Sequence, residues 1–346
     1  MGLTSAATLA LSATITVALF ALLNIKWKSL TNVWIRVISQ ILVQVMLLIT
    51  FFLGLNIQNG FYSSWSDLLG IPTYANKHIA AKTIDLSKAQ FTKNGSAIVK
   101  ETFTGNKSKL TSSIWILIPK SIVKTIQDGA STKYPVAVFL SGSPGVPTAW
   151  LHGLNLDDQI KEAKNQVAIK DFIAVLPDYN ILPHSDTGCM NIPNSVQVET
   201  WLTNDVYKYV LNNLPAKPDN WVVTGYSTGA WCSAMLALKN PEIFKAAAPI
   251  AGYYRPEFPF KIDNEEKKAL KNEYNLVKLS KLNQVDIFIL TSTEDPTSYK
   301  SSLWFHRELG SANNVEILTV PNGGHNFSTW RPLVQDVLKW FALELQ

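Results

Sequence analysis

The chain has 346 residues, of which 47% are hydrophobic and 16% are charged, and its formal net charge is +5. This length and apolar content suffice for one large domain with a sizeable core, and they exclude an intrinsically disordered chain. The net charge is modest and no long Lys/Arg block occurs, which argues against a nucleic-acid-binding protein. Only two cysteines are present, so a CxxC zinc framework and a disulfide-dense mini-protein are both excluded.

The N-terminal part contains two long uncharged stretches. Residues 4–23 and 37–55 carry no charged side chain, and about twenty apolar residues are what a helix needs to cross roughly 30 Å of hydrocarbon. A cleaved signal peptide is one alternative, but no basic side chain precedes the first stretch. A buried pair of core helices is the other, and it would show more regular polar faces. The sequence predicts a transmembrane hairpin over residues 1–58.

The segment between the two stretches sets the expected orientation. It carries Lys26, Lys28 and Arg36 and no acidic residue. The positive-inside rule places such a loop in the cytoplasm. We therefore expect a cell-membrane protein with two spans, whose termini and large C-terminal domain are extracytoplasmic.

Residues 59–95 are predicted to form a connector, and residues 96–346 a single domain. In that domain, apolar runs of strand length alternate with helical patterns. Strands separated by helices imply a doubly wound, mainly parallel sheet that is covered by helices on both faces. The expected strands are residues 97–103, 113–119, 136–140, 172–177, 221–225, 246–252, 287–292 and 315–320.

The stretch "VVTGYSTGAW" places Ser227 between Gly225 and Gly229, directly after an apolar strand and before an alanine-rich helical pattern. Glycines on both sides allow strand and helix to approach without Cβ clashes. Ser227 Oγ then lies above the carboxyl edge of the sheet, at a helix N-terminus that favours developing negative charge. An ordinary tight turn or helix cap is the alternative for a lone GxSxG motif, but this context predicts a nucleophilic serine.

Such a serine requires a carboxylate and then a histidine at the ends of later strands. Asp295 follows the expected strand 287–292. Of the five histidines, only His325 follows a late strand inside a glycine loop. Glu294 adjoins Asp295 and is the alternative acid, although the strand-end pattern favours Asp295. The sequence therefore predicts a triad of Ser227, His325 and Asp295.

Two backbone N–H groups are predicted to stabilise an oxyanion. The N–H of Thr228 follows the nucleophile directly, which is the usual place of one donor. The second is expected from "FLSGSPG", where Gly142 permits close approach and Ser143 offers an N–H that Pro144 lacks. A plain Pro-Gly turn is the alternative for this segment.

From about Ser96 to the C-terminus, the chain resembles the esterase D and antigen-85 mycolyltransferase branch of the α/β-hydrolases. The resemblance lies in "FLSGSPG", "LPDYN", "GYSTGAWCSAMLALKNPEIFKAAAPIAG" and "GGHNFSTW". The whole chain, with "LNIQNGFYSSWSDLLG" after the apolar stretches, is most similar to actinobacterial membrane-anchored esterase-family proteins. The resemblance implies an α/β-hydrolase fold and the same triad. The chain departs from the pattern at Ser292, where such strand ends usually carry glycine, and antigen-85 proteins have a cleaved signal rather than a hairpin.

The expected activity is that of a membrane-anchored extracytoplasmic serine hydrolase, which cleaves carboxylic esters through an acyl-enzyme. If the acceptor is an envelope glycan or lipid rather than water, the protein is an acyltransferase similar to the mycolyltransferases. A membrane-tethered binding module without activity and a peptidase are further alternatives. We expect no cofactor and no metal, because neither HExxH nor GxxxxGK[ST] occurs.

The two cysteines are predicted to form a disulfide. Cys189 lies in the loop after the expected strand 172–177, and Cys232 lies on the helix after Ser227. We expect strand 172–177 to neighbour strand 221–225 in the sheet, so that the loop after one folds over the helix after the other. An oxidising exterior would let the thiols pair. Two separate buried thiols are the alternative, expected in a cytoplasmic enzyme.

Overall fold

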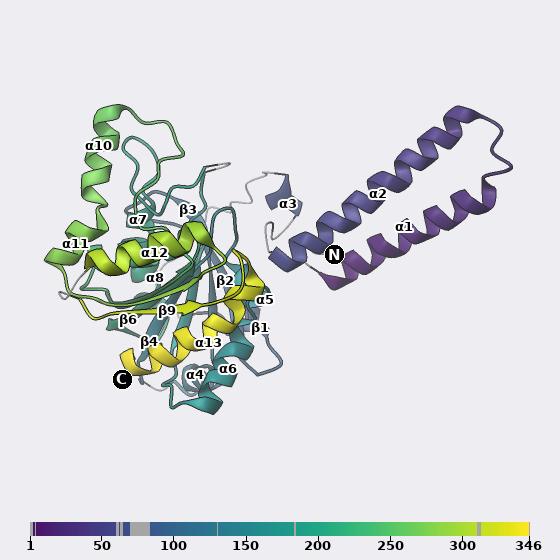
Figure 1. The fold of residues 1–346 in the computed structure, drawn as a ribbon. Coiled ribbons are helices and arrows are strands. Elements are labelled where there is room, and N and C mark those ends of the chain that lie inside the picture. Colours follow the sequence, from purple (N-terminus) through teal and green to yellow (C-terminus); the bar gives the residue numbers. More distant parts are fainter. Residues whose placement is uncertain are drawn as a thin grey trace. The chain divides into compact units, whose positions relative to one another are not determined.

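The computed structural model describes residue 3 and residues 5–59, 62, 65–69, 84–129, 131–182, 185–309 and 313–345. The chain divides into two compact units, Met1–Thr73 and Tyr74–Gln346 (Figure 1). Much of the predicted connector, residues 59–95, lies outside the described residues. The domain boundaries at residues 58 and 95 therefore stay a prediction.

The first unit is a pair of long helices, α1 (Ala6–Lys26) and α2 (Val33–Asn59), followed by the single turn α3 (Trp65–Leu68). Both long helices have the length and apolar composition needed to cross a membrane. Ser5 caps α1 by accepting a hydrogen bond from the N–H of Thr8 at 3.2 Å. The helices pack as a hairpin joined by the short basic segment that the sequence indicated.

Polar side chains lie between the two helices, whereas large apolar ones face outward. The hydroxyl of Thr50 lies 2.7 Å from that of Ser12 and 3.0 Å from that of Thr16. Phe20 and Phe51, by contrast, are 57% and 62% exposed. A helix pair in water normally shows the reverse arrangement, with apolar side chains at the contact.

The second unit is built on one sheet whose strand order is β1-β2-β3-β5-β4-β6-β7-β8-β9. Strands β4 to β9 run parallel to one another, and β1, β2 and β3 extend the sheet at one side by antiparallel pairing, with β3 next to β5. The strand bounds are β1 (Gln90–Phe91), β2 (Ala97–Thr104), β3 (Thr111–Ile118), β4 (Tyr134–Leu140), β5 (Ile173–Pro177), β6 (Ala216–Tyr226), β7 (Phe244–Ile250), β8 (Asp286–Ser292) and β9 (Val315–Val320).

Helices cover both faces of this sheet (Figure 1). Because side chains alternate along a strand, β4 sends Val138 into one core and Phe139 into the other. The core on the Phe139 side is closed by α5 (Thr148–His152), α6 (Leu156–Gln166) and α13 (Phe327–Glu344). The core on the Val138 side is closed by α4 (Lys120–Gln127), α7 (Val198–Thr200), the π-helical turn Trp201–Val206, α8 (Tyr207–Asn213), α9 (Thr228–Lys239), α10 (Asn264–Glu273), α11 (Leu276–Leu282) and α12 (Pro296–Leu309).

The predicted doubly wound α/β class is confirmed, and each of the eight expected strands is present. The edge strand β1 was not expected, because two residues are too few to show an alternating pattern. Helices α7 and α8 and the turn between them form one continuous helical segment, with π-helical geometry from Trp201 to Val206.

One expectation about strand order is wrong. Strands β5 and β6 are not neighbours, because β4 lies between them and pairs in parallel with both. The chain leaves β4 through α5 and α6 to form β5 on one side, and then crosses β4 to form β6 on the other. The helices that follow β4 and β6 thus cover opposite faces, which makes the carboxyl ends of these two strands a topological switch point. The loops after β4 and β6 meet there.

Candidate active site

Ser227 occupies a strained turn between β6 and α9. Its backbone has φ 57° and ψ −123°, a conformation that costs a non-glycine residue about 1–3 kcal/mol. A Cβ at Gly225 would overlap the backbone of Gly229, and a Cβ at Gly229 would overlap the carbonyl of Leu140. Both positions therefore require glycine for β4, β6 and α9 to pack this closely.

The hydroxyl of Ser227 begins a chain of two hydrogen bonds. His325 Nε2 lies 2.9 Å from Ser227 Oγ, and His325 Nδ1 lies 2.6 Å from Asp295 Oδ2. Asp295 is 8% exposed, whereas His325 is 44% exposed. With the proton on Nδ1, the imidazole donates to Asp295 and Nε2 is free to accept from Ser227. This geometry gives the serine a base within hydrogen-bond reach and gives the base an orienting acid.

The two adjacent acids after β8 have different partners. Asp295 precedes α12, and its carboxylate contacts His325. Glu294 Oε2 instead accepts a hydrogen bond from the N–H of Gly323 at 2.8 Å. Of the two acids, Asp295 thus lies against the imidazole, and Glu294 holds the loop that carries it.

His325 is held at the start of α13. Gly323 has φ 106°, which the left-handed turn before the histidine requires. Asn326 caps α13 by accepting from the N–H of Thr329 at 3.2 Å. The imidazole packs edge-on against Trp330, with ring centroids 4.8 Å apart and planes at 88°. These contacts fix the ring so that Nε2 faces Ser227.

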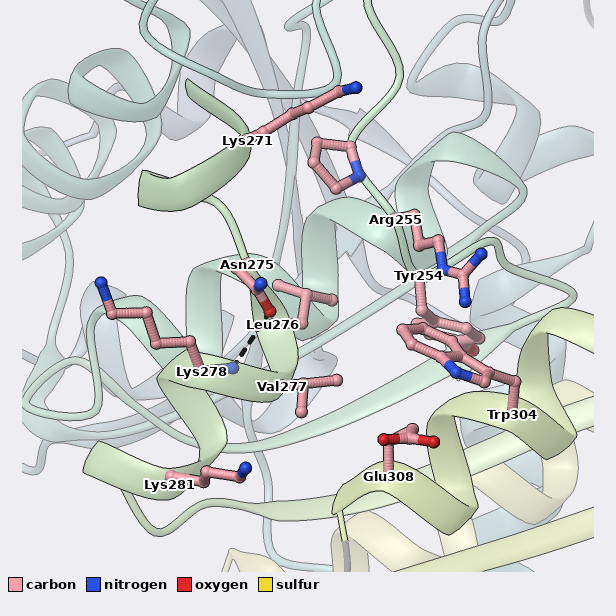
Figure 2. Close-up of a pocket in the computed structure, with 11 residues that line it drawn as sticks. Tyr254, Arg255, Lys271, Asn275, Leu276, Val277, Lys278, Lys281, Trp304 and Glu308 are labelled. Atoms are coloured by element: carbon pink, nitrogen blue, oxygen red, sulfur yellow. Dashed lines mark hydrogen bonds between the residues drawn. The ribbon is translucent and has the colours of Figure 1, made fainter. Parts of the chain in front are cut away.

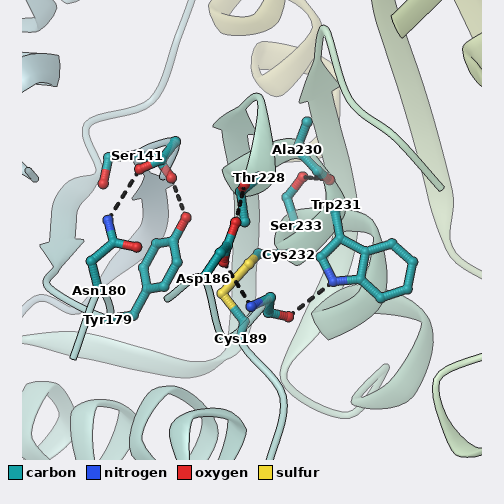
Figure 3. The surroundings of a disulfide bond; sticks show 12 residues. Ser141, Tyr179, Asn180, Asp186, Cys189, Thr228, Ala230, Trp231, Cys232 and Ser233 are labelled. Carbon is teal, nitrogen blue, oxygen red and sulfur yellow. Dashed lines mark hydrogen bonds between the residues drawn. A yellow bond between two sulfur atoms is a disulfide. The ribbon is translucent and has the colours of Figure 1, made fainter. Parts of the chain in front are cut away.

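The loop after β4 packs directly against the serine. A Cβ at Gly142 would lie 3.0 Å from Ser227 Cβ. Asn180 Nδ2 donates to the carbonyls of Gly142 at 3.1 Å and Gly145 at 2.6 Å. The Tyr179 hydroxyl donates to the carbonyl of Ser141 (Figure 3). Tyr179 and Asn180 of the motif "LPDYN" therefore hold the loop that carries Ser143 in place by hydrogen bonds. The donor roles of the Ser143 and Thr228 N–H groups stay predictions.

Asp186 is a site residue that sequence reasoning missed. The hydroxyl of Thr228 donates to Asp186 Oδ2 at 2.5 Å, and the N–H of Gly188 donates to Oδ1 at 2.8 Å (Figure 3). Burial raises the pKa of Asp186, and the hydrogen bond from Thr228 opposes this shift. The sequence shows an acid close to a glycine in "HSDTGCMN", but nothing in this stretch indicates that the acid contacts Thr228.

The same loop is bonded covalently to the helix that follows the serine. Cys189 and Cys232 form a disulfide with a Cα–Cα distance of 5.6 Å (Figure 3). The indole N–H of Trp231 donates to the carbonyl of Gly188 at 2.9 Å. Because β4 lies between β5 and β6, the loop after β5 passes the end of β4 to reach α9. It does not come from a strand next to β6, as the sequence had indicated. Within the described residues, no three His, Cys, Asp or Glu side chains gather as a metal site would require.

The sequence profile of the putative esterase family matches residues 126–341, more than half of the chain. The chain belongs to this family. An uncharacterized protein of Corynebacterium glutamicum is 22% identical over 239 residues, which cover 62% of this chain and 54% of that protein. The chain therefore spans about half the length of the curated relative it matches.

Solved structures of α/β-hydrolases superpose on the second unit. A ferulic acid esterase aligns with a TM-score of 0.62 and 17% identity, over 72% of this chain and 99% of that one. An S-formylglutathione hydrolase from Agrobacterium tumefaciens aligns with 0.60 and 16%, over 76% and 100%. MPT51 of Mycobacterium tuberculosis aligns with 0.51 and 14%, over 72% and 99%. The predicted α/β-hydrolase fold and the resemblance to the esterase D and antigen-85 branch are thus confirmed.

Proposed function

We propose that this member of the putative esterase family is a serine hydrolase that cleaves carboxylic esters. The observation that carries the proposal is the unbroken hydrogen-bonded chain from Ser227 through His325 to Asp295. It lies at the switch point where open α/β sheets bind their ligands. The intact chain also argues against a binding module that has lost its chemistry.

In the first step, Ser227 Oγ attacks the ester carbonyl carbon while its proton passes to His325 Nε2. Asp295 stabilises the imidazolium that forms. The N–H groups of Thr228 and Ser143 bind the tetrahedral oxyanion. The C–O bond to the alcohol then breaks, the proton on Nε2 goes to the leaving oxygen, and the acyl group remains on Ser227.

In the second step, His325 Nε2 takes a proton from the acceptor, whose oxygen attacks the acyl carbon. The bond from that carbon to Ser227 Oγ then breaks, and Nε2 returns the proton to Oγ. Water as the acceptor gives hydrolysis, and a hydroxyl of an envelope glycan or lipid gives acyl transfer. The resemblance to the antigen-85 branch supports acyl transfer as the alternative activity, with the same residues in the same roles. The two activities differ only in the second substrate.

We further propose that α1 and α2 span a membrane, with the second unit on the extracytoplasmic side. Apolar outward side chains and hydrogen bonds between the helices support the span. The basic turn between the helices and the disulfide on the second unit support the orientation. In intact cells, a cysteine placed at Ser29 should be shielded from an impermeant thiol reagent, and one at Ser87 should react. The reverse pattern contradicts the orientation.

A fluorophosphonate probe tests the serine hydrolase proposal, because it reacts covalently with an activated serine. Wild type and Ser87→Ala, which removes an exposed hydroxyl, should be labelled equally, and Ser227→Ala should not be labelled. Labelling of Ser227→Ala at the wild-type level overturns the proposal. Products of p-nitrophenyl ester turnover with added trehalose or glycerol then separate hydrolysis from acyl transfer.

A further inference from the structure

A hollow in the second unit, the hydrolase unit, lies between α10, α11, α12 and the segment after β7 (Figure 2). Its volume is about 670 Å³, which is in the range of small-molecule sites. None of the proposed catalytic and oxyanion residues lines it. Trp304 on its wall comes nine residues after Asp295 on α12, which is about 13 Å along the helix axis. The hollow is therefore separate from the reacting centre.

The lining of this hollow is strongly cationic. Its lining includes Arg255, Lys271, Lys278 and Lys281, with Glu308 as the single acid (Figure 2). Within the described part of the chain, none of the four cations forms a salt bridge. Like charges gathered in a concave surface repel one another, and they also focus a positive potential into it. This arrangement favours an anion.

Two other basic residues, Lys239 and Arg307, do have acidic partners. Lys239 on α9 lies 2.7 Å from Glu199 and 2.5 Å from Glu273, so its charge is neutralised by acids of the protein. Arg307, next to the hollow in sequence, lies 3.8 Å from Glu308. Among the described residues, no acid lies within salt-bridge distance of the four cations of the hollow, and Lys278 Nζ donates to the side chain of Asn272 at 3.1 Å.

The wall of the hollow holds Arg255 in place. Its guanidinium lies over the Trp304 ring, 4.1 Å from the centroid. Tyr254 stacks on Phe305 with centroids 4.2 Å apart and planes at 10°, and its N–H donates to Ser301 Oγ at 3.1 Å. Within the described residues, the guanidinium makes no hydrogen bond. Its planar fork is preorganised to donate to two oxygens of one ligand.

We propose that this hollow binds a phosphate-bearing ligand. A phosphate monoester or a diphosphate offers two or more negative charges and several acceptor oxygens at tetrahedral positions. Such a ligand suits the Arg255 guanidinium together with the ammonium groups of Lys271 and Lys281 better than a single carboxylate does. The proposal concerns binding alone and does not depend on the role of Ser227.

Inorganic pyrophosphate is the probe that tests the site, by titration calorimetry on the full chain in non-ionic detergent at fixed ionic strength. The variant Arg255→Gln/Lys281→Gln should weaken binding by about tenfold or more, since it removes two charge-assisted contacts. The control Lys124→Gln/Lys208→Gln removes the same charge from exposed helix positions outside the hollow, and it should bind within about twofold of wild type.

Absence of pyrophosphate binding to wild type, or equal weakening in both double variants, overturns the proposal. Ser227→Ala should bind pyrophosphate like wild type, which separates this site from the proposed esterase activity. Glucose 6-phosphate and dihexanoyl phosphatidic acid then carry the same phosphate monoester on a sugar and on a lipid. If one of the two binds more tightly than the other and this binding is lost in Arg255→Gln/Lys281→Gln, the result supports the site and shows whether its ligand is a sugar phosphate or a lipid phosphate. If neither binds, the result contradicts the proposal.

Discussion

The two units of this chain use side-chain polarity in opposite ways. In the hairpin, the hydroxyls of Ser12, Thr16 and Thr50 lie between the helices, and phenylalanines such as Phe20 and Phe51 face outward. In the hydrolase unit, apolar side chains fill two cores, and charged side chains lie mostly outside. The hairpin presents apolar side chains to its surroundings, which suits hydrocarbon. The hydrolase unit presents polar side chains to its surroundings, which suits water.

This contrast separates the proposed anchor from the proposed chemistry. Ser227, His325, Asp295, the loop after β4 and the disulfide all lie in the hydrolase unit. Changes at the site should therefore abolish turnover without altering the helix pair, and changes between α1 and α2 should weaken the helix pair without altering turnover.

The largest expected effect comes from the acid beside His325. Asp295→Asn should lower kcat for a p-nitrophenyl ester by about 10⁴-fold, because the amide favours the wrong imidazole tautomer and no longer stabilises the imidazolium. Glu294→Gln removes the same charge one residue earlier, where the side chain holds Gly323 rather than the imidazole. It should cost less than about tenfold. Equal losses would show that Asp295 has no special role.

Loss of the disulfide should destabilise the hydrolase unit more than loss of any one of its hydrogen bonds. Cys189 and Cys232 are 43 residues apart, and a closed loop of this length is worth about 4 kcal/mol on the chain-entropy account. Cys189→Ala/Cys232→Ala should lower the free energy of unfolding by about that amount in urea titrations. Reductant should destabilise wild type and leave the variant unchanged. A variant as stable as oxidised wild type would contradict this expectation.

Removal of the Asn180 side chain, which holds the loop after β4 by hydrogen bonds, should change kcat more than it changes KM. Asn180→Ala loses both hydrogen bonds to the carbonyls of Gly142 and Gly145. The Ser143 N–H would then be displaced, and a 1 Å displacement can cost up to about 10²-fold. We expect kcat to fall by about 10- to 100-fold with a smaller change in KM. A change confined to KM would argue that the loop binds substrate only.

The hydroxyl contacts between α1 and α2 should contribute modestly to the helix pair. Thr50→Val removes the contacts with Ser12 and Thr16, and we expect a loss of about 0.6–1.7 kcal/mol. The measurement is SDS titration in micelles, followed by energy transfer between labels on the two helices. Thr14→Val is the control, because that hydroxyl bonds only the carbonyl of Ala10 in its own helix. Lower ester turnover in Thr50→Val would show that the two units are not independent.

The smallest expected effect is on the pH dependence of stability. Burial, together with Asp286 nearby, raises the pKa of Glu344 from 4.5 to about 7. The folded state therefore binds a proton more tightly than the unfolded state does. The contribution of protonated Glu344 to the free energy of unfolding is complete below about pH 4.5 and is lost as the pH rises to about 7. Partial exposure of the side chain screens the effect.

Melting temperatures of Glu344→Gln from pH 4 to pH 8 test this expectation. The melting temperature of the variant should match that of wild type at pH 4 and exceed it at pH 8. A constant offset between Glu344→Gln and wild type across the range would contradict it.

The features that sequence predicts well are written in local patterns. The apolar runs of β4 to β9 and the glycines around Ser227 each have a sequence signature, and the order of serine, acid and histidine follows from the order of strands. The same order led to Asp295 and His325, which the structure brings within hydrogen-bond reach.

Other features depend on how distant segments pack, and no local pattern reveals them. The position of β4 between β5 and β6 is a choice of topology that strand sequences alone do not determine. The contact between Thr228 and Asp186 joins positions 42 residues apart. The cationic hollow combines Arg255, after β7, with lysines of α10 and α11. No sequence pattern around any one of these residues indicates which distant residue it contacts.

Direct trapping of the acyl-enzyme tests the central claim, that Ser227 is the nucleophile. Wild type mixed with p-nitrophenyl butyrate, quenched in acid within the first turnover and digested, should yield a butyrylated peptide modified at Ser227. Ser227→Ala should yield no acylated peptide. Acylation of another residue in wild type, or of Ser227→Ala to the same extent, would contradict the account.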